Sequence, residues 1–440
     1  MDGYFFLLNH NLIMKQNSIS FYTLGCRLNQ SETAVIQKTF ESDDYKIVRF
    51  DEPADIAVIN TCTVTENGDA DTRRLVNRVN RINPNVQIAL IGCQAQVQKR
   101  KLTKLPNVKW VVGNAVKMDL KSILRELKDE TNVVTPSIPK KEFTLPATGT
   151  YDRLTRANLK IQDGCDFFCS FCEIPYARGR ARSRKFNDIL KEAKALIEAG
   201  HKELVLTGIN LGTYRNNGKT FLNVIDALEQ FDSLERIRIS SIEPTTIPKK
   251  LIKKMAAQSK LCRYLHIPLQ SADDKILKSM KRKYTVKEFT DFIQFAKKTV
   301  EKICVGTDII VGFPGETDQT FESATQRLKD MPIDYFHVFS YSQRELAKSK
   351  YLKNTVNTQI IKKRSKILRR LSDRKRQLFY QTLIGTKQTV LFEQKKDGLW
   401  SGLTDHYVRV SVKTSKSIAN ALLPVKITTL DNQIAVANIV

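Results

Sequence analysis

Residues 164–172 read Gly-Cys-Asp-Phe-Phe-Cys-Ser-Phe-Cys and directly follow an apolar run over Ala157–Gln162. Cys165, Cys169 and Cys172 therefore fall on one short loop after a predicted strand. Soft thiolates are the ligands that hold iron–sulfur clusters. Three thiolates on one loop can bind three irons of a 4Fe–4S cube and leave the fourth iron open. An open metal position is typical of a catalytic site rather than a structural one.

Outward from this loop, apolar runs alternate with amphipathic stretches across residues 151–345. The expected strands are Ala157–Gln162, Glu203–Thr207, Arg236–Ser241, Tyr264–Pro268, Gly306–Val311 and Tyr335–Tyr341. Helices are expected between them, for example over Ile189–Ala199 and Thr317–Met331. Repeated β-α units predict a partial or full β/α barrel, whose active site lies at the carboxyl ends of the strands.

Residues 18–130 show the same alternation on a smaller scale. The expected strands are Ile19–Leu24, Ile56–Ile59, Val86–Ile91 and Val108–Val112, and the expected helices are Ser31–Phe40, Thr72–Arg81 and Gln94–Leu102. This order predicts an open, mostly parallel sheet. Cys26, Cys62 and Cys93 each follow one of these strands, and the carboxyl ends of parallel strands lie along one edge. Three thiolates at that edge favour a second cluster with an open iron, although each cysteine alone would more often be a buried packing residue.

The rest of the chain divides by composition. Residues 131–150 hold Pro136, Pro139 and Pro146 among small and polar residues, which predicts a linker. Residues 346–377 are dense in Lys and Arg and keep apolar residues at helical spacing, so we expect a helix with one packed and one basic face. From about residue 385 the apolar period becomes two, which predicts a small all-β unit. Cys262 and Cys304 fit neither cysteine pattern and are interpreted as core or strand-edge thiols.

The charge balance indicates a polyanionic partner. Lys and Arg number 72 against 46 Asp and Glu, a formal net charge of +26. No apolar run approaches the roughly 18 residues that a membrane span needs, so nucleic acid is favoured over a membrane. The apolar opening at residues 1–8 lacks an export signal and is interpreted as a disordered leader, or as codons upstream of a start at Met14. Without export, clustered cysteines indicate metal ligands rather than disulfides.

The cysteine spacing, with the aromatic Phe171 before the last cysteine, resembles the signature of radical S-adenosylmethionine enzymes. In that family the amino and carboxylate groups of the cofactor bind the open iron, and reductive cleavage gives a 5′-deoxyadenosyl radical. Residues 207–210, 240–244, 266–271 and 306–316 are similar to strand ends of the family's barrel. The resemblance implies cofactor contacts from Gly208, Asn210, Ser241, Glu243, His266, Gln270 and Gly312.

Cys26, Cys62 and Cys93 make the chain resemble one group within that family, the methylthiotransferases. These enzymes join an N-terminal three-cysteine domain, a radical domain and a small RNA-binding β-domain, the TRAM domain. The resemblance implies a cluster domain at residues 18–130, a linker at 131–150, the radical core with its basic helix at 151–380, and a TRAM-like domain at 381–440. It also implies two 4Fe–4S clusters and S-adenosylmethionine as cofactors.

Residues 25–33, Gly-Cys-Arg-Leu-Asn-Gln-Ser-Glu-Thr, are most similar to the branch that acts on threonylcarbamoyladenosine beside the tRNA anticodon. The implied reaction puts a methylthio group on carbon 2 of N6-threonylcarbamoyladenosine at tRNA position 37. The implied partners are the tRNA anticodon loop and an electron donor such as flavodoxin or ferredoxin, with the enzyme a cytoplasmic monomer. The expected RNA contacts are Lys362, Lys363, Arg364, Arg369, Arg370 and Arg374.

Three alternatives stay open from the sequence. Two of them keep the chemistry and change the substrate, to isopentenyladenosine in tRNA or to a ribosomal protein, although those branches carry different residues after the first cysteine. A non-catalytic zinc protein that binds RNA is the third, but His201, the next candidate ligand, lies in a different loop from Cys172. One segment departs from the family: residues 343–348, after Tyr341-Ser342, contain no Gly or Pro, so substrate contacts there are expected to differ.

Overall fold

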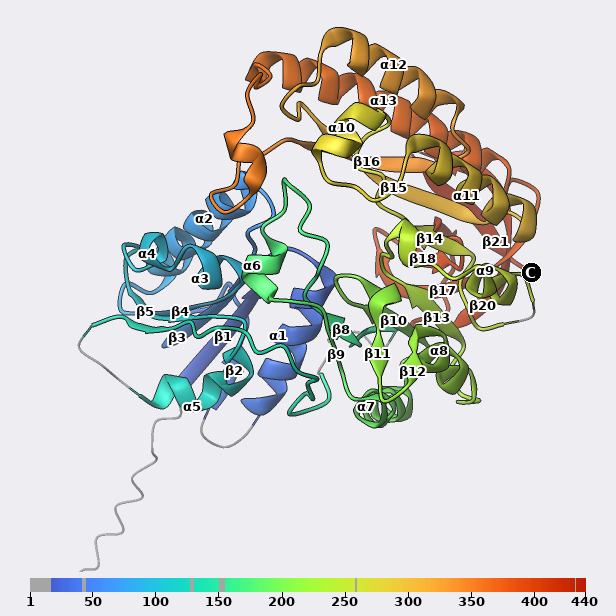
Figure 1. Ribbon diagram of the computed structural model, residues 1–440. Helices are drawn as coiled ribbons and strands as arrows, with labels where there is room; N and C mark the ends of the chain where they lie inside the picture. Colours follow the sequence, from blue (N-terminus) through green and yellow to red (C-terminus); the bar gives the residue numbers. More distant parts are fainter. Residues whose placement is uncertain (1–16, 42–44, 127–129, 150–154, 258, 432) are drawn as a thin grey trace, which may run out of the picture.

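The computed structural model describes residues 17–41, 45–126, 130–149, 155–257, 259–431 and 433–440. The apolar opening and Met14, on which the leader prediction falls, lie outside these residues. Figure 1 shows an N-terminal sheet domain in blue and teal beside a larger β/α domain in green to orange, with a small β-domain in red. Among the described residues, no helix is both long and apolar enough to cross a membrane.

The N-terminal domain is a six-stranded parallel sheet in the order β2-β1-β3-β4-β5-β6. The central strands are β1 (Asn17–Thr23), β3 (Ile56–Thr61), β4 (Gln87–Gly92) and β5 (Val108–Val112). Successive residues of a strand point to opposite faces, and here both faces are covered. Ala57 and Ile59 pack in one hydrophobic cluster, whereas Ile56 and Val58 pack in another. The near-continuous apolar runs that predicted these strands follow from this burial on two sides.

Helices α1 (Arg27–Thr39), α2 (Glu66–Ile82), α3 (Cys93–Val97), α4 (Lys99–Leu102) and α5 (Leu120–Arg125) cover the sheet. The predicted helix over Gln94–Leu102 is in fact two short helices, α3 and α4, which meet at Gln98. Two edge strands were not predicted, β2 (Tyr45–Val48) and β6 (Asn132–Val134). The predicted linker at 131–150 therefore begins with a strand that pairs with β5. Short edge strands bury little apolar surface, so the sequence carries a weak signal for them.

The second domain is a partial β/α barrel of parallel strands, as predicted. One half contains β7 (Arg156–Lys160), β10 (Glu203–Thr207) and β13 (Arg236–Ile239), and the other contains β14 (Tyr264–His266), β15 (Cys304–Val311) and β16 (Tyr335–Ser340). A bridge between Ile237 and Leu261 joins the halves. Among the described residues the pairings run from β7 to β16 without closing the ring. Helix α1 of the N-terminal domain packs against β7, the strand at one open edge.

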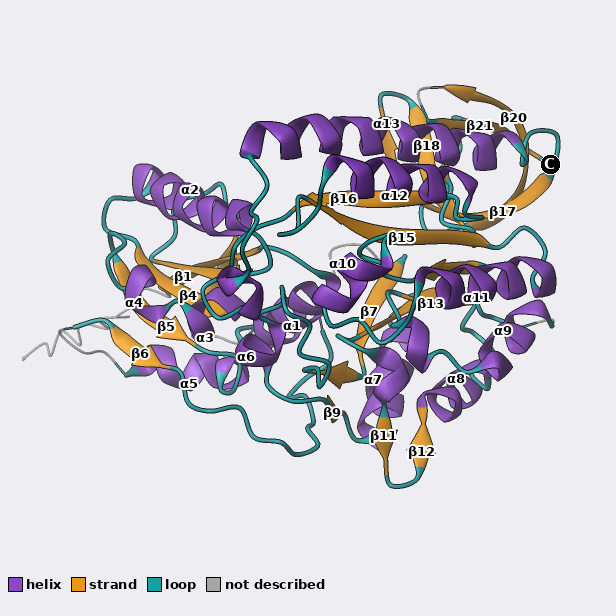
Figure 2. Cartoon of the chain, turned by 45° about the horizontal axis from the view of Figure 1, so that its top comes forward, coloured by secondary structure: helices purple, strands orange, loops and turns teal. Residues whose placement is uncertain are grey.

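Helices surround the barrel strands in an arc in both views (Figures 1 and 2). They are α7 (Phe186–Glu198), α8 (Phe221–Glu229), α9 (Lys249–Ala256), α10 (Asp274–Ser279), α11 (Val286–Thr299), α12 (Asp318–Asp330) and α13 (Thr358–Gln381). The largest hydrophobic cluster lies between these helices and the strands. A short helix, α6 (Ile174–Arg178), follows the cysteine loop on the side that faces the N-terminal domain.

The C-terminal domain is a closed barrel in the order β17-β18-β19-β21-β20. Its strands are β17 (Lys387–Lys396), β18 (Leu399–Thr404), β19 (Arg409–Lys413), β20 (Leu422–Asp431) and β21 (Ile434–Ile439). Two arginines of strand β13, in the β/α barrel, hold the C-terminal domain in place. Arg236 donates to the carbonyls of Thr389 and Leu403, and Arg238 donates to the carbonyls of Thr404 and Asp405. The predicted small all-β unit is thus docked against the β/α barrel.

Candidate active site

The cluster loop, residues 164–172, is held by backbone bonds at both ends. Cys165 N donates to Gly179 O at 3.1 Å, and Ser170 N donates to Met280 O at 3.0 Å. Gly164 has φ +69°, and a Cβ there would lie 2.1 Å from Arg180 O. Only glycine fits this approach without strain. Backbone contacts to residues 179–180 and 280 therefore fix the shape of the loop.

Each sulfur of the cluster loop accepts an N–H donor. The backbone N–H of Phe167 lies 3.5 Å from Cys165 Sγ, and that of Ile174 lies 3.4 Å from Cys172 Sγ. Arg282 Nη1 donates to Cys169 Sγ at 3.2 Å. Donors of this kind favour thiolate over thiol and tune the potential of sulfur-bound iron.

Burial raises the pKa of Cys165 to about 11 and the pKa of Cys172 to about 12. Both thiols are therefore protonated at neutral pH unless a metal displaces the proton. Among the described residues, no three His, Cys, Asp or Glu side chains gather as the ligands of one metal ion. The three thiolates of a 4Fe–4S cluster bind three different irons, and the CxxxCxxC loop supplies three sulfurs from one short segment.

The auxiliary site is formed by Cys26, Cys62 and Cys93, which the structure brings to one edge of the N-terminal sheet. Cys26 caps α1 after β1, Cys62 follows β3, and Cys93 begins α3 after β4. These three strands are neighbours in the sheet, so their carboxyl ends lie together. A Cβ at Gly25 would lie 2.8 Å from Cys62 Sγ, which shows how closely the first two loops approach.

The auxiliary sulfurs also accept N–H donors. The backbone N–H groups of Asn29 and Val64 act on Cys26 and Cys62, and both bonds favour the thiolate. Asn114 Nδ2 donates to Cys93 Sγ at 3.5 Å. Burial nevertheless raises the pKa of Cys62 to about 12, so this site also needs a metal to hold its thiolates. The donor set of soft thiolates with N–H partners fits a second iron–sulfur cluster.

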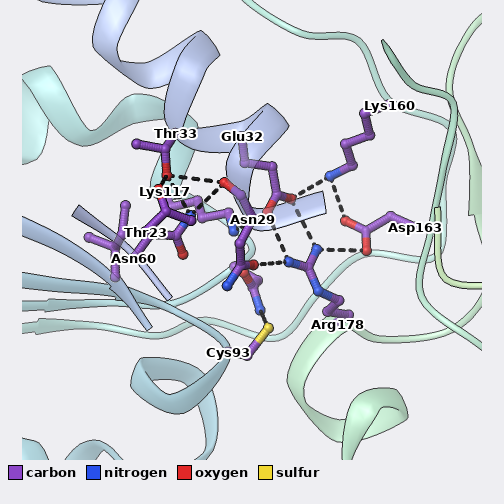
Figure 3. A network of polar contacts seen from close by, with 12 residues as sticks. Thr23, Asn29, Glu32, Thr33, Asn60, Cys93, Lys117, Lys160, Asp163 and Arg178 are labelled. Atoms are coloured by element: carbon purple, nitrogen blue, oxygen red, sulfur yellow. Dashed lines mark hydrogen bonds and ion pairs between the residues drawn. The ribbon is translucent and has the colours of Figure 1, made fainter. Parts of the chain in front are cut away.

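A buried network of charges joins the two cysteine sites (Figure 3). Glu32 of α1 pairs with Arg178 at 2.8 Å and with Lys160 at 2.6 Å. Asp163, two residues before Cys165, pairs with Arg178 at 3.0 Å and with Lys160 at 2.7 Å. Burial acts to raise the pKa of Glu32, but Arg178 and the two neighbouring lysines together hold this pKa well below its usual range.

Among the residues predicted to contact the cofactor, Glu243 lies beside the cluster loop. Its carboxylate accepts from Arg282 Nη2 at 2.5 Å, and the same guanidinium donates to Cys169. Burial raises the pKa of Glu243, against the opposing effect of Arg282. His266 connects two further groups: its Nδ1 lies 3.2 Å from Ser241 Oγ and its Nε2 lies 3.2 Å from Asp308 Oδ1.

The other predicted cofactor contacts are more scattered. Gln270 lines a cavity of about 160 Å³ together with Phe171, Asp308 and Phe339. Gly208 lies against Gln162, whose Oε1 also accepts the backbone N–H of Asn210 at 2.8 Å. Gly312 lies against Ile361 of α13, so it packs the basic helix onto the barrel.

The predicted RNA contacts all lie on α13, but they differ in exposure. Lys362, Lys363, Arg369, Arg370 and Arg374 are exposed. Arg364 departs from the prediction, because it is only 4% exposed and pairs with Glu316 and Asp318. A helix with period 3.6 turns one residue of a basic run toward the protein, where acidic partners bury it. Cys262 and Cys304 lie in the hydrophobic cluster beneath the C-terminal domain, as predicted for core thiols.

Sequence reasoning missed the groups that surround the sulfurs. Arg178 and Arg282 are the main examples, and no local pattern distinguishes them from other basic residues. Arg344 lies in the segment that departs from the family and is 4% exposed. It donates to Thr63 Oγ1, next to Cys62, and to Glu173, next to Cys172. That segment therefore connects the loops of the two cysteine sites.

Comparison with known proteins agrees with this architecture. Residues 159–328 match the family model described as the radical SAM superfamily, and residues 18–113 match the one described as uncharacterized protein family UPF0004. A solved structure of the radical S-adenosylmethionine methyltransferase TsrM from Kitasatospora setae has the same fold, with a TM-score of 0.55 at 13% identity over 73% of both chains.

Two curated relatives match nearly the whole chain. The threonylcarbamoyladenosine tRNA methylthiotransferase MtaB of Aquifex aeolicus is 36% identical over 91% of this chain and 98% of the relative. The protein of that name in Bacillus subtilis is 35% identical over 93% of both chains. Both matches take in more than nine tenths of this chain. The chain belongs to the radical S-adenosylmethionine methylthiotransferase family.

Proposed function

We propose that this protein transfers a methylthio group to carbon 2 of N6-threonylcarbamoyladenosine at position 37 of tRNA, giving 2-methylthio-N6-threonylcarbamoyladenosine. The observation that carries this proposal is the pair of three-cysteine sites in one chain, joined by a buried network. The relatives from Aquifex aeolicus and Bacillus subtilis are named for the same substrate.

The cofactors are two 4Fe–4S clusters and S-adenosylmethionine. Cys165, Cys169 and Cys172 would hold one cluster, and the auxiliary site would hold the other. When bound, these groups supply the radical that opens an unactivated carbon–hydrogen bond and the methylated sulfur that replaces the hydrogen. Acid–base side chains alone do not open such a bond, so the residues around the clusters act mainly by positioning.

Arg282 is the main positioning group at the cluster loop. Its guanidinium donates to Cys169 Sγ, to Glu243 and to the carbonyl of Pro268. These bonds fix the loop against the ends of β13 and β14. Glu243 and the pair Ser241–His266 lie at those same strand ends, where a polar cofactor would be oriented. Gln270, beside Phe171 in the cavity, is the group placed to contact a ligand between the loop and β15.

The tRNA would lie along the exposed face of α13 and the C-terminal β-domain. Lys362, Lys363, Arg369, Arg370 and Arg374 provide contacts to phosphates, which give affinity that falls with salt. An anticodon-loop base is single-stranded and can be turned out toward the clusters at modest cost. A small reduced redox protein such as flavodoxin or ferredoxin would supply electrons to a cytoplasmic monomer.

In vitro turnover tests the proposal. Reconstituted protein, S-adenosylmethionine, dithionite and tRNA carrying threonylcarbamoyladenosine are incubated without oxygen, and nucleosides are identified by mass spectrometry. We expect 2-methylthio-N6-threonylcarbamoyladenosine. Parallel reactions contain tRNA with isopentenyladenosine, or ribosomes. Methylthiolation only in one of those reactions would contradict the proposed substrate.

Metal content separates the enzyme from a zinc-dependent RNA-binding protein. Two 4Fe–4S clusters correspond to about eight irons per chain. Anaerobically purified protein should therefore be brown and contain iron and sulfide. Colourless protein with stoichiometric zinc would contradict the enzymatic proposal.

A further inference from the structure

The buried network beside the auxiliary site contains more positive than negative groups. Glu32 and Asp163 are its two carboxylates, each 1% exposed at the side chain. Four cations meet them: Lys117, Lys160, Arg178 and Arg182, with side chains 1%, 4%, 0% and 10% exposed. Each cation contacts a carboxylate, but four cations and two carboxylates leave the network with a net charge of two positive units. An uncompensated net charge in a buried network is costly, so the network indicates an anion nearby.

The auxiliary thiols are the neighbouring groups that can supply this anion. The charge of Cys93 acts on both Arg178 and Lys117, and Arg178 in turn favours the thiolate of Cys26. Arg178 Nε is buried and has no hydrogen-bond partner among the described residues. The guanidinium therefore keeps one donor beyond those used for Asn29, Glu32 and Asp163, which Figure 3 shows as dashed contacts.

The loops that carry the auxiliary cysteines are tied to the end of α6, where Arg178 lies. Asn29 accepts from Arg178 Nη2 at 2.5 Å, and its own Nδ2 donates to Leu24 O at 2.8 Å and Thr61 O at 3.0 Å. Leu24 lies two residues before Cys26, and Thr61 directly precedes Cys62. Asn114, which donates to Cys93 Sγ, also donates to Ala177 O at 2.7 Å. Arg178 is thus held in a fixed position relative to all three sulfurs.

We propose that Arg178 is a positioning residue for the auxiliary cluster: its buried guanidinium offsets the negative charge of the thiolate-bound cluster and thereby raises the cluster's reduction potential. The inference rests on the proposed function, which assigns a cluster to Cys26, Cys62 and Cys93. Three thiolates outweigh the 2+ charge of an oxidised 4Fe–4S core, and one-electron reduction to the 1+ core adds a further negative charge. A nearby cation in a medium of low dielectric stabilises the reduced form more than the oxidised form.

The test compares two substitutions that break the same ion pair with opposite changes of charge. Arg178→Gln removes a positive charge, and Glu32→Gln removes a negative one. Both are made in the full chain with Cys165, Cys169 and Cys172 replaced by Ala, so that only the auxiliary cluster is present. Midpoint potentials are measured by electron paramagnetic resonance during reductive titration with dithionite.

We expect a lower midpoint potential for Arg178→Gln and a higher one for Glu32→Gln. Arg178→Lys should stay near the parent value, because it keeps the charge. Arg364→Gln is the matched control, since it removes another buried guanidinium paired with carboxylates, those of Glu316 and Asp318, on helix α13. Its potential should not change. If Arg178→Gln takes up no cluster, Lys117→Met replaces it, with the same expected sign.

Shifts of the same sign for Arg178→Gln and Glu32→Gln, or no shift in either, would overturn the inference, because loss of the ion pair alone would act alike in both variants. The result for the parent protein separates this from failure of the proposed function. If the parent without the cluster-loop cysteines contains no iron, the auxiliary assignment itself is wrong, and the inference falls with it. If the parent protein contains iron and the midpoint potentials of the variants do not shift, the charge effect is rejected and the auxiliary-cluster assignment stands.

Discussion

The cluster loop and the auxiliary site each present three cysteine sulfurs, but they are built in different ways. Cys165, Cys169 and Cys172 share one loop that a glycine and backbone bonds hold in shape. Cys26, Cys62 and Cys93 come from three loops that meet only because their strands are neighbours in a parallel sheet.

The charges around the two sites differ as well. At the cluster loop, Arg282 is balanced by Glu243 in a close pair. At the auxiliary site, the network around Arg178 keeps a positive excess. One site therefore lies on a single segment of the chain, and the other depends on the strand order of the N-terminal sheet. Substitutions should affect the two sites differently.

The largest difference is expected when a ligand is removed from each site. Cys169→Ala should abolish both cleavage of S-adenosylmethionine and methylthiolation of tRNA. Cys26→Ala should abolish methylthiolation and leave cofactor cleavage, since the cluster loop does not need the auxiliary sulfurs for its shape. Quantifying 5′-deoxyadenosine and modified nucleosides in the same reaction checks both. Loss of cleavage in Cys26→Ala would show that the two sites are not independent.

A large effect on stability is expected from Glu32→Ala. The substitution leaves Lys117, Lys160 and Arg178 buried with one carboxylate fewer, which should lower the free energy of unfolding by about 3–5 kcal/mol. Urea denaturation of the apoprotein measures this. Lys38→Ala, on the same helix, removes an exposed ion pair with Glu41 and should change stability by less than about 0.5 kcal/mol. Equal effects of the two variants would contradict a buried, domain-joining role for Glu32.

A moderate effect on RNA binding is expected from the exposed side of α13. Each phosphate contact removed should reduce the salt slope of tRNA affinity by about one, so Arg369→Ala with Arg370→Ala should reduce it by about two. Arg364→Ala is the matched control on the same helix, because its guanidinium is buried against Glu316 and Asp318. It should lower stability and leave the slope unchanged. A slope that responds to Arg364 and not to Arg369 and Arg370 would place the RNA elsewhere.

The smallest effect is expected where the N-terminal domain meets the loop after β16. Lys101 and Glu345 form an exposed ion pair at 3.0 Å, and the hydrogen bond from Lys101 lowers the pKa of Glu345. A carboxyl with a lowered pKa stabilises the fold above its unfolded pKa and loses that contribution as the pH falls. Lys101→Ala should cost about 0.2–1 kcal/mol at neutral pH and less at a pH below the lowered pKa of Glu345, where the carboxyl is protonated. Denaturation curves at both pH values measure the difference, and an equal loss at low pH would show that the pair does not act through charge.

The difference between a site on one loop and a site built from three loops also explains which features could be predicted from the sequence. The CxxxCxxC spacing is local, so Cys165, Cys169 and Cys172 were identifiable at once. Cys26, Cys62 and Cys93 were recognised as a set only through the predicted strand order, which the parallel sheet confirms. The apolar runs located the barrel strands because parallel strands are buried on both faces. The edge strand β6 was missed because it buries too little to leave a pattern.

The network around Arg178 and the contact of Arg282 with Cys169 could not be predicted from the sequence, because each joins residues far apart in the chain. Arg364 shows a local prediction that the tertiary structure changes: it was expected to contact RNA, and it is buried. Its neighbours Lys362 and Lys363 are exposed, and only the rotation of the helix against α12 and the loop before it decides that Arg364 is buried.

Mass spectrometry of tRNA nucleosides from a strain that lacks this protein tests the central claim most directly. We predict that 2-methylthio-N6-threonylcarbamoyladenosine disappears, that N6-threonylcarbamoyladenosine accumulates in its place, and that the intact gene restores the modification whereas the gene encoding Cys26→Ala does not. Unchanged 2-methylthio-N6-threonylcarbamoyladenosine in the deletion strain would contradict the proposed function.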